Sequence, residues 1–353
     1  MARRASPEQV GQATVKDVAA LAGVSISTVS RVLGGTYPVA TATRAKVVRA
    51  MRELDFVVNA HARALAGAHT KVVAFVLDDV TGPFHAAVAR GVEHQATTEG
   101  RLCLLCTTHG DPQRELAVIE LMREQQADAV ILVGGAWEDS EHQERMTHFA
   151  RALDRSGSRM VLCGRPTLGP DVPATVVEYD NENGAYAITS HLLSAGHRRI
   201  AFLGVIDKLT TTTQRVRGFT EAHRAYGLEP DPGLILNGDF TRASGHQMTR
   251  QLLADGKRFT AIFAATDIVA AGVYQALREA NLRVPEDVSV VGYDDIPLAL
   301  DLVPTLTTVH VPHDELGRTA VRLAINRATE PVQHVMLGTH IAVRHSVGPP
   351  PTP

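Results

Sequence analysis

Residues 15–35 read VKDVAALAGVSISTVSRVLGG and decide how the N-terminal part of the chain folds. Thr14 immediately precedes this stretch, and Asp17 stands three residues after Thr14. This is the spacing of a capping box at the start of a helix. Gly23 is expected to end that helix, and Ser25 is expected to cap a second one. Two short helices separated by a tight glycine turn predict a helix-turn-helix, whose second helix enters the DNA major groove.

The apolar pattern around this turn predicts a small three-helix core. A third helix is expected from about residue 41 to residue 54, because its apolar residues recur at helical spacing. The residues expected to point inward are Val18 and Leu21 in the first helix, Val29 and Val32 or Leu33 in the second, and Val47, Val48, Met51 and Leu54 in the third. A small helical bundle that binds no DNA would show the same pattern.

The charge distribution favours an anionic partner for this part of the chain. Residues 1–71 contain ten Lys and Arg but four Asp and Glu, whereas the rest of the chain contains 25 and 34. A small basic segment on an acidic body is typical of a nucleic-acid-binding domain, although a randomly solvated surface gives the same excess. Charge and helix spacing together favour DNA.

The stretch VKDVAALAGVSISTVSRVLGG resembles the DNA-binding headpiece of the LacI/GalR family of bacterial transcription regulators, which typically reads KDVAxxAGVSxxTVSRVLN. Gly34 stands where that pattern has Asn. Residues 59–70, NAHARALAGAHT, resemble the hinge helix of the same family, whose pattern is NxxARxL. The resemblance implies a helix-turn-helix domain over residues 1–58, a hinge helix over 59–70, and an effector-binding and dimerisation core over 71–348.

The resemblance also implies which residues contact DNA. Ile26, Ser27 and Arg31 match base-reading positions, and an Arg at such a position forks onto guanine. Leu65 matches an apolar wedge that unstacks a base step in the minor groove. The hinge is too short for a stable isolated helix, so we expect it to order on DNA beside a dimer mate. The expected DNA contacts, of which Ser25 either binds a phosphate or only caps its helix, are Thr14, Ser25, Ile26, Ser27, Thr28, Ser30, Arg31, Asn59, Ala62, Leu65 and Ala66.

From residue 71 onward, apolar runs alternate with amphipathic helical stretches. Continuous apolar runs separated by helices are typical of a parallel α/β sheet. The runs are VVAFVL (72–77), LCLLC (102–106), AVILV (129–133), MVLC (160–163), IAFLG (200–204), LILN (234–237), AIFAA (261–265) and VSVVGY (288–293). The series divides near residues 180–181 into two similar halves. We therefore expect two Rossmann-like lobes with a cleft between them, similar to the periplasmic-binding-protein-like core of the LacI/GalR family.

The expected lobes are discontinuous in sequence. The first would comprise residues 71–180 and 312–331, and the second residues 181–309 and 332–348. LTTVHVP (306–312) is expected to cross back to the first lobe, and a short strand near HVMLG to return toward the second.

Charged and aromatic side chains follow the expected strands. Ligands in open α/β sheets lie beyond the carboxyl ends of the strands. Carboxylates accept from hydroxyls, Arg donates in a fork and an aromatic ring covers an apolar face, so these residues suit a polyhydroxylated effector. The expected effector contacts are Asp78, Phe84, Arg165, Arg215, Phe240, Asp267 and Asp294, with Asp79, Gly164 and Tyr293 beside them.

Alternatives remain open for three of these residues. Arg215 and Asp294 either contact the effector or form a salt bridge across the cleft, and Asp267 either contacts the effector or caps a helix. Leu209 stands where purine-binding members of the family have an arginine, which favours a sugar or a sugar phosphate over a nucleobase.

Enzyme signatures are missing from the sequence. GxSxG, a P-loop, GxGxxG and HExxH are absent, and we expect no catalytic residue, no metal site and no cofactor. Cys103 and Cys106 of CLLC are expected to be buried or to lie on opposite faces of a strand rather than to form a redox pair. The best alternative function is a sugar-binding or sugar-modifying enzyme, such as a kinase, fused to a DNA-binding domain. A regulator that responds to a nucleobase is the alternative within the family.

The sequence thus predicts a ligand-responsive transcription regulator, most simply a repressor, that binds double-stranded DNA at a palindromic operator as a homodimer. No apolar run reaches the length of a membrane span, no secretion signal is evident, and three cysteines fit a reducing, cytoplasmic setting. The C-terminal SVGPPPTP has no heptad pattern, so a dimer is expected rather than a tetramer.

Overall fold

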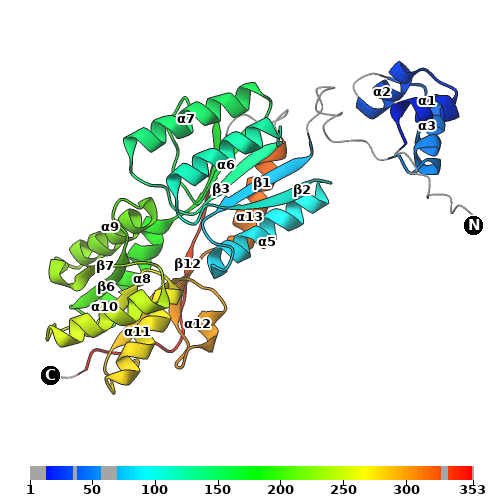
Figure 1. Ribbon diagram of the computed structural model, residues 1–353. Coiled ribbons are helices and arrows are strands. Elements are labelled where there is room, and N and C mark those ends of the chain that lie inside the picture. The colour runs from blue at the N-terminus through cyan, green and yellow to red at the C-terminus, as the bar shows by residue number, and fades with distance from the viewer. Residues whose placement is uncertain (1–12, 35–37, 57–69, 327–332, 352–353) are drawn as a thin grey trace, which may run out of the picture. The chain divides into compact units, whose positions relative to one another are not determined.

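The computed structural model describes residues 13–34, 38–56, 70–326 and 333–351. By their internal contacts, the residues divide into two compact units, Met1–Lys71 and Val72–Pro353 (Figure 1). The described part of the first unit contains the helices α1 (Val15–Ala22), α2 (Ile26–Gly34) and α3 (Thr41–Glu53). The expected helix-turn-helix with its third helix is therefore confirmed.

Gly23 makes the turn between α1 and α2. Its φ of 62° lies in the left-handed region, where a side chain would strain the backbone. Val18, Val29 and Val47, one from each helix, are fully buried against one another. Leu21, however, is 47% exposed, so its expected inward position is wrong. The buried stripe of α1 runs between Val18 and Ala22, and Leu21 lies about 100° away from its centre around the helix.

The expectation for α3 was also wrong at Val48, which is 36% exposed, whereas its neighbour Val47 is fully buried. Successive helix residues differ in direction by about 100°, and the buried residues of α3 are Val47 and Ala50, so that Val48 lies at the edge of the buried stripe.

The first lobe of the second unit is a parallel sheet covered by helices on both faces. Its strand order is β11-β5-β4-β3-β1-β2. The strands are β1 (Val72–Leu77), β2 (Leu102–Thr107), β3 (Ala129–Val133), β4 (Arg159–Cys163), β5 (Ala174–Tyr179) and β11 (His334–Leu337). Helices α5 (Pro83–Thr98) and α13 (His313–Ile325) pack on one face, and α6 (Pro112–Glu124) and α7 (Ser140–Arg155) pack on the other.

The second lobe repeats this architecture with the strand order β7-β6-β8-β9-β10-β12. Its strands are β6 (Ile200–Val205), β7 (Ile235–Asn237), β8 (Ala261–Ala264), β9 (Ser289–Asp294), β10 (Thr307–His310) and β12 (His340–Ala342), of which β12 alone runs antiparallel to its neighbour. Helices α8 (Asn181–Ser194) and α9 (Thr210–Ala225) cover one face, and α10 (Arg242–Ala254) and α11 (Asp267–Glu279) cover the other. Two short elements, η1 (Pro232–Leu234) and α12 (Leu298–Asp301), complete this lobe.

The chain passes between the lobes three times, near residues 180, 311 and 338. The third passage corrects the expected boundary. The HVMLG segment forms β11, which pairs in parallel with β5 and so belongs to the first lobe. Only β12, after Gly338, joins the second sheet. The assignment of residues 334–337 to the second lobe is therefore wrong, because an edge strand only four residues long carries no periodicity that shows which sheet it joins.

Glycines let neighbouring helices approach closely within each lobe. A Cβ atom on Gly91 of α5 would lie 2.1 Å from the carbonyl oxygen of Asp314 at the start of α13. A Cβ on Gly272 of α11 would lie 2.0 Å from the carbonyl oxygen of Arg242 at the start of α10. Because backbone atoms occupy these positions, each helix pair is locked at a short separation.

Strand β2 is the edge of the first sheet and exposes apolar side chains. Leu102 is 65% exposed, and Leu104 and Leu105 are 39% and 40% exposed. Cys103 and Cys106 are half-buried free thiols rather than fully buried ones, and burial raises the pKa of both. An apolar edge strand of this kind is a surface that proteins normally cover.

Candidate functional site

The exposed face of α2 presents the side chains expected to read bases. Ile26, Ser27, Ser30 and Arg31 are all exposed. Their spacing of i, i+1, i+4 and i+5 places them on one side of the helix. Val29, on the other side, is fully buried, so packing of the first unit fixes which face α2 offers to a partner.

The hydroxyl of Ser25 caps α2. It accepts the backbone N–H of Thr28 at 3.2 Å and lies within 2.9 Å of the hydroxyls of Ser27 and Thr28. At α1, the carboxylate of Asp17 accepts from the backbone N–H and the hydroxyl of Thr14 at 2.8 and 2.7 Å, and these hydrogen bonds lower the pKa of Asp17. Ser25 and Thr14 therefore have a capping role, and the contacts of these two residues with DNA stay predictions.

The expected hinge contacts Asn59, Ala62, Leu65 and Ala66 lie outside the described residues.

A cavity of about 550 Å³ lies between the two lobes. It opens at the carboxyl ends of the strands where the strand order reverses, between β1 and β3 in one sheet and between β6 and β8 in the other. Of the residues expected there, the cavity is lined by Asp78, Asp79, Phe84, Arg165, Arg215, Phe240 and Asp294. Gly164, Asp267 and Tyr293 are not among its lining residues.

The guanidinium of Arg215 is buried and held on every side. Its Nε donates to Oδ1 of Asn181 at 2.9 Å, and one terminal nitrogen donates to the carbonyl of Ala265. The other terminal nitrogen donates to the hydroxyl of Tyr179 at 3.3 Å. The guanidinium carbon lies 3.6 Å from the centre of the Tyr293 ring, a cation–π contact that explains why Tyr293 sits behind the cavity wall.

Asp294 forms a salt bridge with Arg215 at 3.3 Å. The two residues belong to β9 and α9 of the same lobe, so the expected alternative of a salt bridge is present but does not span the cleft. Burial raises the pKa of Asp294 to about 6, although the Arg215 charge acts in the opposite direction. Its φ of 103° is in a sparsely populated region for a residue with a side chain, a form of strain that concentrates at functional sites.

Arg165 is neutralised within the first lobe. Its two terminal nitrogens donate to the two carboxylate oxygens of Glu115 at 2.9 and 2.6 Å, and it also donates to the carbonyls of Val133 and Gly134. Nε2 of His142 lies 3.3 Å from the same carboxylate. Burial alone would raise the pKa of Glu115, but the Arg165 charge and these hydrogen bonds outweigh it and lower the pKa to about 2.

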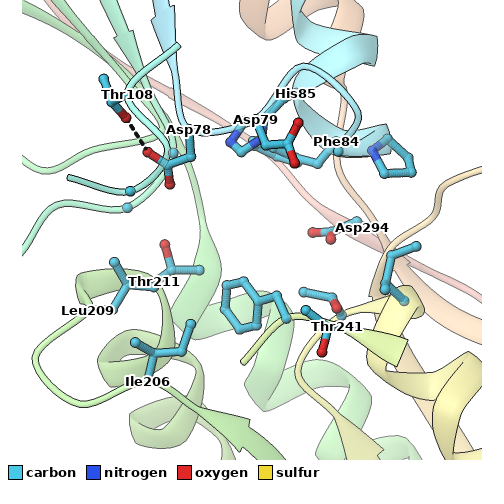
Figure 2. A pocket seen from close by; sticks show the side chains of 18 of the residues that line it. Asp78, Asp79, Phe84, His85, Thr108, Ile206, Leu209, Thr211, Thr241 and Asp294 are labelled. Carbon is cyan, nitrogen blue, oxygen red and sulfur yellow. Dashed lines mark hydrogen bonds between the residues drawn. The ribbon is translucent and has the colours of Figure 1, made fainter. Parts of the chain in front are cut away.

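Two carboxylates follow β1 on the first-lobe side of the cavity. Asp78 accepts from the hydroxyl of Thr108 at 3.0 Å, as Figure 2 shows. Asp79 accepts from the backbone N–H and hydroxyl of Thr81 at 2.8 and 2.9 Å, and these bonds lower its pKa. His85 lies beside them, and burial lowers its pKa. These groups offer hydrogen-bond acceptors to the cavity.

A short backbone ladder joins the lobes beside the cavity. Residues 136–138 follow β3 in the first lobe, and residues 208–210 lead into the start of α9 in the second. Trp137 and Leu209 form an antiparallel bridge between these two segments. The hydrogen bonds of this ladder run from the N–H of Ala136 to the hydroxyl of Thr210 (2.9 Å), from the N–H of Thr210 to the carbonyl of Ala136 (3.0 Å) and from the N–H of Glu138 to the carbonyl of Lys208 (2.8 Å). These hydrogen bonds connect the two lobes directly at this side of the cavity.

Several cavity residues were not foreseen from the sequence. Trp137 follows β3 and could have been found as a strand-end residue, like Asp78. Glu115 and His142 lie near the starts of α6 and α7, where no strand-end rule points to them. Other unforeseen lining residues are His85, Tyr179, Ile206, Thr211, Thr241 and Ile296.

Asp267 has a structural position. Its side chain is fully buried, with Oδ1 accepting from the hydroxyl of Thr308 at 2.6 Å and Oδ2 accepting from the N–H of Ile296 at 2.9 Å. Burial and the charge of Asp294 raise its pKa well above the usual range. The cap of α11 is Thr266, which accepts from the N–H of Val269. Asp267 thus neither lines the cavity nor caps α11. Instead, its carboxylate holds the loop that follows Asp294 through the N–H of Ile296.

A helix-turn-helix unit joined to two Rossmann-like lobes, with a cavity of charged and apolar side chains between the lobes, defines a DNA-binding regulator with a ligand-binding core. Two family models match the chain: bacterial regulatory proteins of the lacI family over residues 14–59, and a periplasmic binding protein-like domain over residues 189–347. The Escherichia coli (strain K12) ribose operon repressor is 37% identical over 90% of this chain and 94% of its own length. The chain belongs to the lacI family of bacterial regulatory proteins.

Two solved structures resemble the whole chain. The transcriptional regulator CelR in complex with cellobiose is 35% identical, with a TM-score of 0.69 over 95% of this chain and 99% of that chain. The lac repressor dimer bound to operator and the anti-inducer ONPF is 25% identical, with a TM-score of 0.79 over the same shares of the two chains.

The described residues offer neither a metal site nor a membrane-spanning helix. No group of three or more His, Cys, Asp or Glu side chains there is arranged to hold a metal ion. None of the helices in that part of the chain is long and apolar enough to cross a membrane.

We expect Asp267→Ala to lower the free energy of unfolding of the core by about 2–6 kcal/mol, because a buried hydroxyl and a buried N–H lose their acceptor at about 1–3 kcal/mol each. Urea denaturation followed by circular dichroism measures this change, with Asp267→Asn as the milder control. A variant that keeps its stability but loses its effector response would show that Asp267 acts as a ligand contact instead.

Proposed function

We propose that this chain is a repressor whose operator binding is controlled by a saccharide bound between the two lobes, and that it has no catalytic activity. The observation that carries the proposal is the pair Arg215 and Asp294 in the wall of a cavity that combines charged and apolar side chains, in a chain that also exposes a recognition helix. The relatives are regulators rather than enzymes, and two of them carry saccharides in their names or titles: ribose and cellobiose.

Operator recognition is assigned to the exposed face of α2. Arg31 would donate two hydrogen bonds to the O6 and N7 atoms of a guanine in the major groove. Ile26 has no hydrogen-bonding group and would contact a thymine methyl. The hydroxyls of Thr28 and Ser30 would bind phosphates, which fixes the position of the helix without reading sequence. The hinge residues, with Leu65 as a minor-groove wedge, are proposed to act beside it.

Effector recognition is assigned to the cavity. Asp294 would accept hydrogen bonds from neighbouring hydroxyls, and Phe84 and Phe240 would cover the apolar faces of a sugar ring. Leu209, in place of the arginine of purine-binding relatives, lines the cavity and offers no donor to a nucleobase. The effector can alter DNA binding only if it binds the closed and open arrangements of the lobes with different affinity.

We further propose that the chain acts as a homodimer in the bacterial cytoplasm and that β2 takes part in the dimer interface. The exposed Leu102, Leu104 and Leu105 form an apolar edge on the first lobe. The lac repressor, to which the chain is similar, is a dimer on its operator. A two-fold dimer would place two recognition helices on the half-sites of a palindrome.

Replacement of Arg31 by Ala is expected to weaken operator binding by about 5- to 150-fold, equivalent to about 1–3 kcal/mol, while binding to random DNA changes much less. Fluorescence anisotropy at fixed salt with both duplexes measures the ratio. Lys46→Ala, which removes an exposed cation from α3, is the matched control and should weaken both complexes to the same degree. An equal loss on both duplexes for Arg31→Ala would contradict base reading.

A charge on the β2 edge should disrupt the dimer. Leu104→Glu is expected to convert the protein to a monomer at micromolar concentration, as measured by sedimentation velocity, and to lower operator affinity with it. Leu121→Glu, at an exposed apolar position on α6, provides a control with the same change in charge. A Leu104→Glu protein that remains dimeric would exclude β2 from the interface.

Effector binding is expected to weaken as the pH falls through about 6, because Asp294 must be ionised to accept hydrogen bonds from hydroxyls and its raised pKa is about 6. Calorimetric titration at pH 5, 6, 7 and 8 with the saccharide that gives the largest thermal shift measures this dependence. Asp294→Asn should bind weakly at every pH. Constant affinity of the unsubstituted protein from pH 5 to pH 8 would argue against a role for Asp294.

A further inference from the structure

Each arginine buried in the cavity wall is already paired with a carboxylate, so its positive charge is not available to an anionic ligand. Both terminal nitrogens of Arg165 are occupied by Glu115, and Arg215 is paired with Asp294 and stacked on Tyr293. A phosphate group would have to displace these carboxylates, each of which is already buried against its arginine.

The carboxylates that follow β1, by contrast, are not paired with an arginine. Asp78 and Asp79 accept only from Thr108 and Thr81 and are otherwise exposed to the cavity. Among the charged lining residues that the structure describes, Arg242 is the cation without an acidic partner, and it is exposed at the start of α10. The first-lobe side of the cavity is therefore rich in hydrogen-bond acceptors, whereas the unpaired Arg242 belongs to the second lobe.

The cavity has two ends that offer different surroundings. Figure 2 shows Asp78 and Thr108 at one end, facing Leu209 and Thr211 across the space, with Asp294 toward the other end. The bridge between Trp137 and Leu209 adds an indole to the wall at the first of these ends. Each end thus combines a carboxylate with apolar surface, which is the combination that binds a sugar ring.

The volume of the cavity is large enough for a ligand that fills both of its ends. Its volume of about 550 Å³ lies in the middle of the range of about 300–1,000 Å³ that holds drug-sized ligands. A single sugar ring would leave one end to water, and the acceptors there without donors from the ligand.

We propose that the effector is an uncharged saccharide of two rings. One ring lies at Asp294 and Arg215 beside Phe84, and the second lies between Asp78 and the wall formed by Trp137 and Leu209. This inference rests on the proposed function and narrows it: sugar phosphates, single sugars and nucleobases are excluded as the preferred effector.

Trp137 is the only tryptophan in the chain, so its fluorescence reports directly on the second ring. The full-length protein is titrated with six uncharged disaccharides (cellobiose, maltose, lactose, sucrose, trehalose and melibiose), with glucose and ribose, with glucose 6-phosphate and ribose 5-phosphate, and with guanine. Thermal shift and release of operator DNA are measured in parallel. At least one disaccharide is expected to change the emission and to bind at least tenfold more tightly than every other class.

Asp78→Asn tests the second end of the cavity. The preferred disaccharide should bind it at least fivefold more weakly, glucose and ribose should bind unchanged, and glucose 6-phosphate should bind more tightly because a repelling charge is gone. Asp139→Asn is the matched control: it removes the same charge from the first lobe outside the cavity, and Asn also caps helices well. It should behave like the unsubstituted protein.

The outcomes separate this inference from the proposed function. A single sugar, sugar phosphate or nucleobase that binds most tightly and releases operator would overturn the two-ring inference and leave effector control intact. Unchanged disaccharide affinity in Asp78→Asn would also overturn it. If no compound of any class alters emission, melting temperature or operator binding, both the inference and the saccharide-controlled function fail.

Discussion

The buried guanidinium of Arg215 is the group around which the second unit is organised. A buried charge is tolerated only when its hydrogen-bonding capacity is filled, and here the partners come from β5, α8, β9 and the residue that follows β8. These elements meet close to the first passage between the lobes. The position of Asp294, and with it the polarity of the cavity, therefore depends on satisfying one cation.

The position of Asp294 is also fixed by the packing of Gly292 against Asp267. Gly292 lies next to Asp267, and a Cβ there would lie 2.2 Å from the Asp267 carboxylate. Asp267 in turn holds the N–H of Ile296, just beyond the strained backbone of Asp294. The first three residues of GYDD (292–295) are thus explained: a glycine leaves space for Asp267, a tyrosine stacks on the guanidinium, and Asp294 lines the cavity.

The sequence predicted the architecture well because its strands are continuous apolar runs, and strand ends in such folds face the ligand. Asp78, Arg165 and Asp294 were reached by this rule. The rule failed where a strand is short or where a residue reaches the cavity from an element other than a strand end. The strand ATVVEY, which ends in Tyr179, was not recognised, and HVMLG was assigned to the wrong lobe. Asp267 also follows a strand, but its side chain turns into the lobe, a direction that strand ends alone do not reveal. Glu115 and His142 reach the cavity from helices and were missed.

Strand β1 has the cavity at one end and the join to the first unit at the other. It is six residues long, roughly 20 Å at about 3.3 Å per residue, and is paired on both sides, with β2 and β3. Such a strand neither stretches nor bends easily, and the close packing of α5 on α13 at Gly91 stiffens the lobe around it. A rotation of the first lobe would therefore turn β1 as one rigid element, so that a change of angle at Asp78 would be accompanied by an equal change at Val72.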